Sequence, residues 1–386
     1  MASIIPYSCQ DISEADIAAV ADVLRAPFLT QGPAVPKFEA EFAALHGVEH
    51  GIAVANATAG LHIACMALGA GPGMHVWTSP NSFVASANCA RYCGATVGFV
   101  DIDPGTRNMS VDRLAEKLAQ AEAEGSLPGI VIPVDFAGFP CDMKKIRALA
   151  DRYGFRIVSD SSHAVGATYH GEPVGQYADI TVFSFHPVKI ITTGEGGLCM
   201  TSDAGLADSM RKARSHGITR DPAEMEQEPD GPWYYEQVSL GYNYRLTDIQ
   251  AALGSAQLTR LAEREARRDF LARRYDDALV SLPLRLPPRS NDRTSAHHLY
   301  VVEVDETRTP RTRTEVYDQL RSDAISPNVH YIPIHLQPDF KRLGFAAGDF
   351  PASEAYYRRA ITIPLFPTMT EEQQDRVIAS LTRALT

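Results

Sequence analysis

Short apolar runs alternate with helical patterns between residues 51 and 202 of this chain. The apolar runs cover residues 51–55, 75–79, 97–101, 129–135, 155–160, 179–185 and 197–202. Helical patterns fall between several of them, at 58–68, 83–93, 111–124 and 142–153. This alternation predicts an α/β fold with a mostly parallel central sheet and helices on both faces. The last two runs lie too close together for a helical crossover, so one of these strands is expected to be antiparallel to the rest.

The remaining segments predict a large domain over residues 1–250 and a smaller C-terminal α/β domain over 251–386. A capping box at Thr247 and Gln250 opens a long helix that is expected to run to about Leu282 and to connect the two domains. Before the sheet we expect a helix at 12–24, with Ser13 as its cap and Asp16 at its third position, and a helix at 37–46 after a Gly/Pro loop at 28–36. Residues 218–240 are polar and without periodicity, so they are expected to form a long loop. In the smaller domain we expect a strand at 297–304 and helices at 314–322 and 370–384.

The charge balance argues against some classes of partner. The net charge of −11 over 386 residues disfavours general affinity for nucleic acid or anionic membranes. Residues 51–90 carry no charged side chain, but Gly and Pro interrupt them, so they are expected to be core and loops and not a membrane span. The N-terminus lacks a secretory pattern, and the expected location is the cytoplasm. The six scattered cysteines form no C-x-x-C pair, and no metal site is expected.

Lys189 stands in an unusual sequence context. Between Ile180 and Gly194 it is the only Lys, Arg, Asp or Glu. A buried lysine loses part of its affinity for a proton, and its free amine is a nucleophile. Asp160 ends the apolar run 155–160, and together these two residues suggest a Schiff-base cofactor, pyridoxal phosphate (PLP), whose pyridinium nitrogen needs an acidic partner. The alternative is an aspartate that caps a helix and a lysine whose amine reaches solvent.

Other polar residues also end or follow apolar runs. In sheets of this kind ligands bind at the carboxyl ends of the strands. This rule predicts that Asn56, Asp135, Asp160, Ser184 and Lys189 lie in one neighbourhood.

The turn Asn56–Gly60 follows a strand and opens a helix, so its free amides are a candidate phosphate site, although a plain helix cap has the same pattern. No G-x-G-x-x-G follows a strand, which disfavours a dinucleotide. Phe83 could stack on a planar ring or belong to the core. His163 could lie above the same site as Asp160, and His186 could move protons or simply end its strand.

The chain as a whole resembles the DegT-type sugar-nucleotide aminotransferases, which are PLP enzymes of fold type I. The resemblance runs nearly end to end and includes the segments FLTQGP, NATAGLHIA, PVDFAGFPCDM, SDSSHAVGATYHG, FSFHPVKIITTGEGG, RSHGITR, PWYYEQVSLGYNYRLTDIQAALG and ITIPLFPTMT. Within the family, the segments around Lys189 and Asn243 are most similar to the C4-aminotransferases of pseudaminic acid biosynthesis. NATAGLHIA is closer to enzymes that make 4-amino-4-deoxyarabinose nucleotides. SDSSHA replaces the more usual EDASHA and keeps Asp160 and His163.

The resemblance implies a role for individual residues. Lys189 would bind PLP covalently, and Asp160 would hold its ring nitrogen protonated. His163 would lie near the ring, Phe83 would stack on it, and His186 would be a further catalytic candidate close to Lys189. Contacts to the phosphate would come from Thr58, Ala59, Ser184 and, from a neighbouring subunit of a homodimer, Asn243. Position alone suggests that Tyr7, Thr30, Gln31, His330, Tyr331 and His335 contact the sugar.

The implied reaction moves the amino group of L-glutamate, which leaves as 2-oxoglutarate, to C4 of a 4-keto-6-deoxy sugar nucleotide. UDP-2-acetamido-2,6-dideoxy-hexos-4-ulose is the expected substrate, and keto sugars that lead to 4-amino-4-deoxyarabinose, perosamine or 3-amino sugars are alternatives. Related PLP-dependent sugar dehydratases have histidine in place of the lysine, so Lys189 favours transamination. A PLP-binding protein without turnover and a nucleotide-binding module without PLP are the remaining alternatives.

Overall fold

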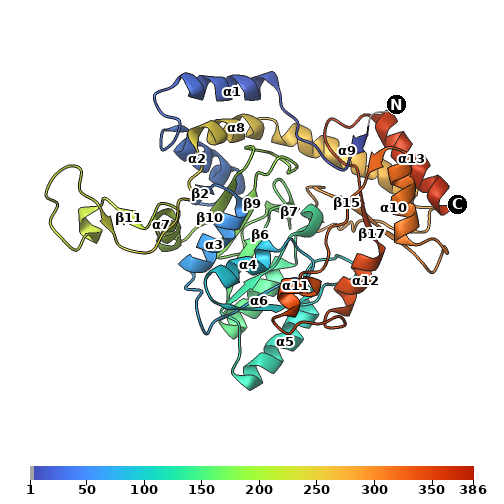
Figure 1. The fold of residues 1–386 in the computed structure, drawn as a ribbon, viewed down its shortest axis with the longest axis horizontal. Helices are drawn as coiled ribbons and strands as arrows, with labels where there is room; N and C mark the ends of the chain where they lie inside the picture. Colours follow the sequence, from blue (N-terminus) through green and yellow to red (C-terminus); the bar gives the residue numbers. More distant parts are fainter. Residues whose placement is uncertain (1–3) are drawn as a thin grey trace.

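The computed structural model describes residues 4–386, and its centre is a seven-stranded sheet of order β2-β10-β9-β6-β5-β3-β4 (Figure 1). The strands are β2 (His50–Val54), β3 (His75–Thr78), β4 (Thr96–Phe99), β5 (Ile130–Ile132), β6 (Arg156–Asp160), β9 (Ile180–Ser184) and β10 (Gly197–Thr201). β10 pairs antiparallel with both of its neighbours, and every other pairing in this sheet is parallel. The mostly parallel sheet and its one reversed strand are therefore confirmed. Within residues 4–386, the helices are all too short or too polar to span a membrane.

Helices cover both faces of this sheet, as the alternation of runs predicts. They are α2 (Ala34–His46), α3 (Ala57–Ala67), α4 (Ala85–Tyr92), α5 (Val111–Glu124), α6 (Met143–Tyr153), α7 (Ala204–Ala213) and α8 (Asp248–Leu258). One face packs Ile52 and Val54 against α3, α4 and α7. On the other face Ala53 lies under α2 and α8, while Trp77 and Val131 lie under α5 and α6. Successive residues of β2 thus point to opposite buried faces, which explains why the strands are apolar throughout.

The segments that flank the sheet differ from the expectation in two places, at the helix after Thr247 and in the loop 218–240. Helix α1 (Glu14–Arg25) begins at the predicted cap, Ser13, which forms a capping box with Asp16, and it lies beside α8 (Figure 1). The expected single helix from Thr247 to about Leu282 is wrong, because the chain forms α8 and then α9 (Leu261–Leu279). At the break, Arg260 leaves the helical conformation and the buried Arg264 donates to the carbonyl of Gln257, which supplies the partner that α8 lacks at its end.

The expected loop 218–240 contains an antiparallel pair of short strands, β11 (Ile218–Thr219) and β12 (Glu236–Gln237), and a 3-10 turn, η2 (Pro222–Glu224). This segment projects from the body as an arm at the left of Figure 1. The arm exposes Trp233 and Tyr235.

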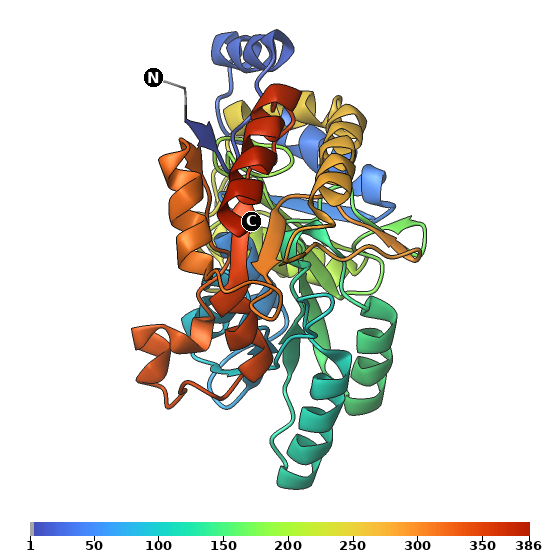
Figure 2. The same ribbon diagram turned by 90° about the vertical axis from the view of Figure 1, so that its right-hand side faces the viewer.

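The C-terminal part of the chain is a smaller α/β unit around the antiparallel sheet β13-β15-β17, and α10 and α13 lie side by side on it (Figure 2). Its elements are β13 (Leu284–Arg285), β15 (Tyr300–Val304), α10 (Arg313–Ser322), β16 (Ile325–Ser326), η3 (Ile334–Leu336), α11 (Pro338–Lys341), α12 (Pro351–Arg359), β17 (Ala360–Ile363) and α13 (Glu371–Leu385). β1 (Ile5–Pro6) pairs with β16, so the first described residues belong to this unit. The boundary at residue 250 stays a prediction.

A third, three-stranded sheet lies between the two units. It consists of β14 (Arg293–Thr294), β7 (Thr168–Tyr169) and β8 (Glu172–Pro173). The short 3-10 turn η1 (Phe136–Gly138) follows β5 and lies beside the segment that leads into β15, since Ala296 N donates to the carbonyl of Gly138.

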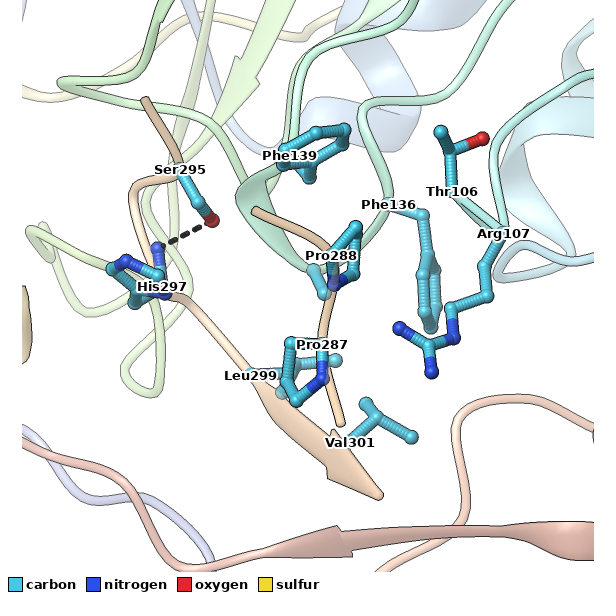
Figure 3. A pocket seen from close by; sticks show the side chains of 11 residues that line it. Thr106, Arg107, Phe136, Phe139, Pro287, Pro288, Ser295, His297, Leu299 and Val301 are labelled. Carbon is cyan, nitrogen blue, oxygen red and sulfur yellow. Dashed lines mark hydrogen bonds between the residues drawn. The ribbon is translucent and has the colours of Figure 1, made fainter. Parts of the chain in front are cut away.

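A buried ion pair joins the two units. Arg107, in the loop after β4, donates from Nε to Glu303 of β15 at 2.9 Å, and Arg359 donates to the other oxygen of the same carboxylate at 2.8 Å. Arg107 also lines a cavity of only about 20 Å³, room for about one water molecule, next to Phe136 and Val301 (Figure 3). The junction between the units is therefore closely packed and electrostatically paired.

We expect Glu303→Gln to destabilise the protein strongly, because it leaves two largely buried guanidinium groups without their carboxylate. Breaking a buried ion pair costs about 3–5 kcal/mol. Urea unfolding followed by circular dichroism measures this loss. Glu116→Gln is the matched control, since Glu116 pairs with Arg113 at the surface and should cost less than about 1 kcal/mol. Equal effects of the two variants would contradict a coupling role for Glu303.

Candidate active site

A cavity of about 810 Å³ opens at the carboxyl ends of β2, β6 and β9, within the size range of ligand pockets. It brings together most of the residues singled out in the sequence: Tyr7, Thr58, Phe83, Asp160, His163, Ser184, His186, Lys189, His330 and Tyr331. Those from Thr58 to Lys189 belong to the unit of the seven-stranded sheet, whereas Tyr7 follows β1 and His330 and Tyr331 belong to the C-terminal unit. Of the five residues predicted to share one neighbourhood, Asn56, Asp160, Ser184 and Lys189 line this cavity, whereas Asp135 does not.

One side of the cavity is built on a row of three strand residues. Gly197 of β10 pairs with Val54 of β2 and with Ser184 of β9, so the three residues lie in register across the sheet. A Cβ atom on Gly197 would lie 2.7 Å from the backbone nitrogen of Ala57. Only glycine therefore lets β10 pass this close to the first turn of α3. The result places the start of α3 next to the hydroxyl of Ser184.

The first turn of α3 is an anion site by its geometry. Asn56 caps the helix by accepting from the amide of Ala59 at 2.9 Å. The amides of Ala57 and Thr58 have no intrahelical partner, and both residues line the cavity. With the positive end of the helix dipole, they can bind a phosphate group together with Ser184. The expectation for Ala59 is corrected: the cap uses its amide, and Ala59 is absent from the cavity lining.

Lys189 lies in a dense protein environment in the turn after β9, where its backbone amide donates to the carbonyl of His186. Among the residues of 4–386 that line the cavity, it is the only Lys or Arg. Burial lowers the pKa of its amine to about 8, and the charge of Asp160 offsets this only in part. Roughly a tenth of the amine is therefore neutral at pH 7, far more than for an ordinary lysine, and this fraction can attack a carbonyl.

Asp160 ends β6 and is 5% exposed, at the wall of the cavity. Three donors bind its carboxylate. Ser162 donates to Oδ1 from its hydroxyl at 2.6 Å and from its amide at 3.2 Å, and Ser86 donates to Oδ2 at 2.6 Å. These donors fix the orientation of the carboxylate.

Phe83 presents its ring to the cavity and is 59% exposed. A large aromatic ring exposed at a cavity wall is not core packing, and its face is available to stack on a planar ligand. The nearest aromatic across the space is Tyr331, with 6.4 Å between the ring centroids.

His163 is buried and held in one tautomer. The amide of Ala137 donates to its Nδ1 at 3.2 Å, so the ring proton is on Nε2, which lies 3.1 Å from the hydroxyl of Tyr331. The Tyr331 oxygen accepts this proton, and its own proton is left to donate elsewhere. Burial, followed by the charges of Lys189 and His330, lowers the pKa of His163 well below its usual value, so the ring is neutral.

Several residues of the site were not predicted from the sequence. His298 and Asn328 line the cavity, and Nδ1 of His298 has no hydrogen-bond partner within residues 4–386. Burial and the nearby charge of Lys189 lower the pKa of His298 well below its usual value and that of His330 to about 3. Ser162 could have been found, because it lies between Asp160 and His163 in the chain. Ser86 and His298 could not, since nothing local in the sequence marks them.

Besides Ala59, five expected residues do not line this cavity. His335 is buried against Phe350 and pairs with Glu354 at 3.0 Å, so its expected contact with the sugar is wrong. Thr30 and Gln31 are exposed on the loop before α2. Asn243 is exposed as well, outside the cavity of its own chain. Asp135 lies behind the site, where the hydroxyl of Ser161 donates to it at 2.7 Å and burial raises its pKa to about 6.

Comparison with known proteins places this geometry in context. Residues 10–382 match the DegT/DnrJ/EryC1/StrS aminotransferase family. The chain is 39% identical over 380 residues to the spore coat polysaccharide biosynthesis protein SpsC of Bacillus subtilis, covering 98% of this chain and 96% of that protein.

Solved structures give the same result. The putative sugar aminotransferase Spr1654 of Streptococcus pneumoniae superimposes with a TM-score of 0.90 at 30% identity, over 98% of each chain. Helicobacter pylori PseC, an aminotransferase involved in the biosynthesis of pseudoaminic acid, does so with 0.91 at 28% identity, over 99% of each chain. The fold is that of the fold type I aminotransferases.

The residues present fit the cofactor of these enzymes. PLP needs an amine, an acidic partner for its ring nitrogen, a surface for its ring and an anion site for its phosphate. The cavity offers Lys189, Asp160, Phe83 and the first turn of α3, and the close approach at Gly197 keeps that turn beside Ser184.

The lowered pKa of Lys189 predicts how fast PLP attaches covalently at different pH values. A protonated amine cannot attack a carbonyl, so the rate should rise with pH through a midpoint near 8 and then level off. Stopped-flow absorbance of apoprotein mixed with PLP measures this profile. Lys189→Ala should show no covalent attachment after borohydride treatment. A midpoint near the usual lysine value of 10.5 would contradict the desolvation of this amine.

Proposed function

Because the chain belongs to the DegT/DnrJ/EryC1/StrS aminotransferase family and is thus a PLP-dependent sugar aminotransferase, we propose that it aminates C4 of a 4-keto-6-deoxy sugar nucleotide. The amino donor is L-glutamate, and the substrate is UDP-2-acetamido-2,6-dideoxy-hexos-4-ulose. The observation that carries the proposal is that Lys189, with its lowered pKa, and Asp160 line the same cavity.

The choice of sugar is supported by similarity. PseC acts in the biosynthesis of pseudoaminic acid and matches this chain over 99% of its length. SpsC, at higher identity, is a protein of spore coat polysaccharide biosynthesis. Both names point to carbohydrate assembly, and the segments around Lys189 and Asn243 resemble the C4-aminotransferases within the family.

In this proposal the residues of the cavity divide the binding of the cofactor among them. Lys189 would bind it covalently, Asp160 would pair with its ring nitrogen, and Phe83 would stack on its ring. The amides of Ala57 and Thr58 and the hydroxyl of Ser184 would bind its phosphate. PLP supplies an electrophilic carbonyl and a ring that accepts electrons from the reacting carbon.

The residues of the chain then move protons. The Lys189 amine, once free, takes a proton from Cα of glutamate and in the second half-reaction delivers one to C4 of the sugar. Its pKa near 8 suits both tasks, because the amine can be present in either form at neutral pH. His186 lies at the cavity near Lys189 and is a candidate to exchange protons with solvent.

The sugar is proposed to lie against the opposite wall. Tyr7, His330 and Tyr331 line that wall, and the free hydroxyl proton of Tyr331 can donate to a sugar oxygen. Thr30 and Gln31 lie outside the cavity of their own chain, so they could reach a sugar nucleotide only in the site of a second subunit.

A homodimer is part of the proposal. Asn243 is exposed, and the arm beside it carries Trp233 and Tyr235, which are 68% and 50% exposed. Leu240, between the arm and Asn243, is 69% exposed. Large apolar side chains gathered on a projecting segment are typical of a surface that a partner covers. A second copy of the chain would cover them and bring Asn243 to the phosphate of the partner site.

The proposal predicts turnover of glutamate with a UDP-4-keto sugar to give 2-oxoglutarate and the 4-amino sugar nucleotide, identified by NMR. A panel with keto-sugar nucleotides of the arabinose, perosamine and 3-keto types tests the choice of sugar. Lys189→Ala should lower the rate by at least about 10³-fold, since it removes the proton-transferring amine.

Lys117→Ala is the matched control for this variant. Lys117 also has a pKa lowered by burial to about 8, but its Nζ donates to the carbonyl of Phe99 and packs on Trp77, away from the cavity. It should keep turnover close to that of the unaltered enzyme. Amination of a 3-keto sugar instead would overturn the C4 assignment, and full activity of Lys189→Ala would overturn the mechanism.

The shared site predicts complementation between two inactive variants. Lys189→Ala and Asn243→Ala should each be impaired alone, but a hybrid dimer contains one site with both native residues. Refolding the two together at equal amounts should restore about a quarter of the activity, because half of the dimers are hybrids with one intact site each. An activity equal to the mean of the two separate variants would contradict a site shared between chains.

A further inference from the structure

The hydrogen bonds around Asp160 include a chain that begins at Ser82, in the segment before α4. Ser86, in the first turn of α4, donates to Oδ2 of Asp160 at 2.6 Å, and the hydroxyl of Ser82 lies 2.7 Å from that of Ser86. A carboxylate only accepts, so the single hydroxyl proton of Ser86 is used on Asp160. Ser82 must then be the donor to Ser86. The order of donation is therefore Ser82 to Ser86 to Asp160.

Counting acceptor positions shows what this chain leaves free. A carboxylate offers about four lone pairs, two on each oxygen. The hydroxyl and the amide of Ser162 occupy both positions on Oδ1. Ser86 occupies one position on Oδ2. One lone pair of Oδ2 remains for a donor in the cavity that Asp160 lines.

We propose that Ser86, supported by Ser82, is a positioning residue that turns Oδ2 of Asp160 toward the pyridine nitrogen of PLP. Both serines are almost fully buried, so water does not compete for these bonds. Neighbouring hydrogen bonds in such an environment strengthen one another. The inference rests on the proposed role of Asp160 and adds to it which oxygen pairs with the ring and what holds it.

The location of the two serines gives them a second connection to the cofactor. Ser82 and Ser86 flank Phe83, the ring proposed to cover the cofactor, and Ser82 itself lines the cavity. One short segment before and within α4 therefore sets both the face of the ring and the partner of its nitrogen.

The test uses the full-length protein loaded with PLP labelled with ¹⁵N at the ring nitrogen. Ser86→Ala leaves the Asp160 carboxylate bound by Ser162 alone. We expect the dissociation constant of PLP to rise roughly tenfold. We also expect the ¹⁵N resonance to change from the protonated to the unprotonated position at a lower pH than in the unaltered protein. A purely structural role of Ser86 would not move this resonance.

Ser159→Ala is the matched control. Ser159 precedes Asp160 in the sequence and is also buried, but its hydroxyl lies 3.1 Å from the hydroxyl of Ser161 and does not bind Asp160. It should leave both the PLP affinity and the resonance unchanged. Ser82→Ala should change the PLP affinity and the ¹⁵N resonance in the same direction as Ser86→Ala but by less. It replaces Ser86→Ala in the test if that variant does not fold. Unchanged resonances in both Ser82 and Ser86 variants, or an equal shift in the Ser159 control, would overturn the inference.

Asp160→Asn separates this inference from the proposed function. If the nitrogen stays protonated in Asp160→Asn, the role of Asp160 itself is wrong. If the proton is lost there but not in Ser86→Ala, only the role of Ser86 fails.

Discussion

The close approach of β10 to the first turn of α3 is the constraint on which the site depends. Gly197 leaves space for the backbone of Ala57, where a methyl group would lie 2.7 Å from its nitrogen. This contact keeps Val54, Gly197 and Ser184 in one row across three strands. The helix start, the Ser184 hydroxyl and the turn that carries Lys189 then follow from the ends of neighbouring strands, with no long loop needed to bring them together.

The electrostatics of the cavity rest on removal from water more than on pairing of charges. Lys189 faces the neutral rings of His163, His298 and His330, whose pKa values are all lowered by burial and by the lysine itself. None of these rings adds a positive charge, and none neutralises one. The amine therefore keeps a pKa near 8, low enough to react and high enough to return a proton.

Local patterns in the sequence predicted the sheet, its reversed strand and the helix caps, because these depend on apolar runs and on residues such as Ser13 and Asp16. They also placed Lys189, Asp160 and Ser184 at strand ends. The break between α8 and α9 was not predicted, since it depends on Arg264, whose side chain donates to the carbonyl of Gln257 only in the folded chain. Ser86 and His298 were not predicted for the same reason. Both are distant in sequence from the site, and only tertiary packing brings Ser86 to Asp160 and His298 to Lys189.

The cavity has two walls of different origin. The residues proposed to hold the cofactor belong to strand ends and turns before residue 200, whereas Asn328, His330 and Tyr331 belong to the C-terminal unit, which Tyr7 joins through β1. The two walls meet at His163, which donates to the hydroxyl of Tyr331 and packs against the ring of His298 with 4.5 Å between the ring centroids. If the sugar lies against the second wall, as proposed, directed evolution toward new sugars would vary residues 328–330 and Tyr7 and leave Lys189, Asp160 and Ser184 unchanged. The choice of sugar and the binding of the cofactor could then be altered separately.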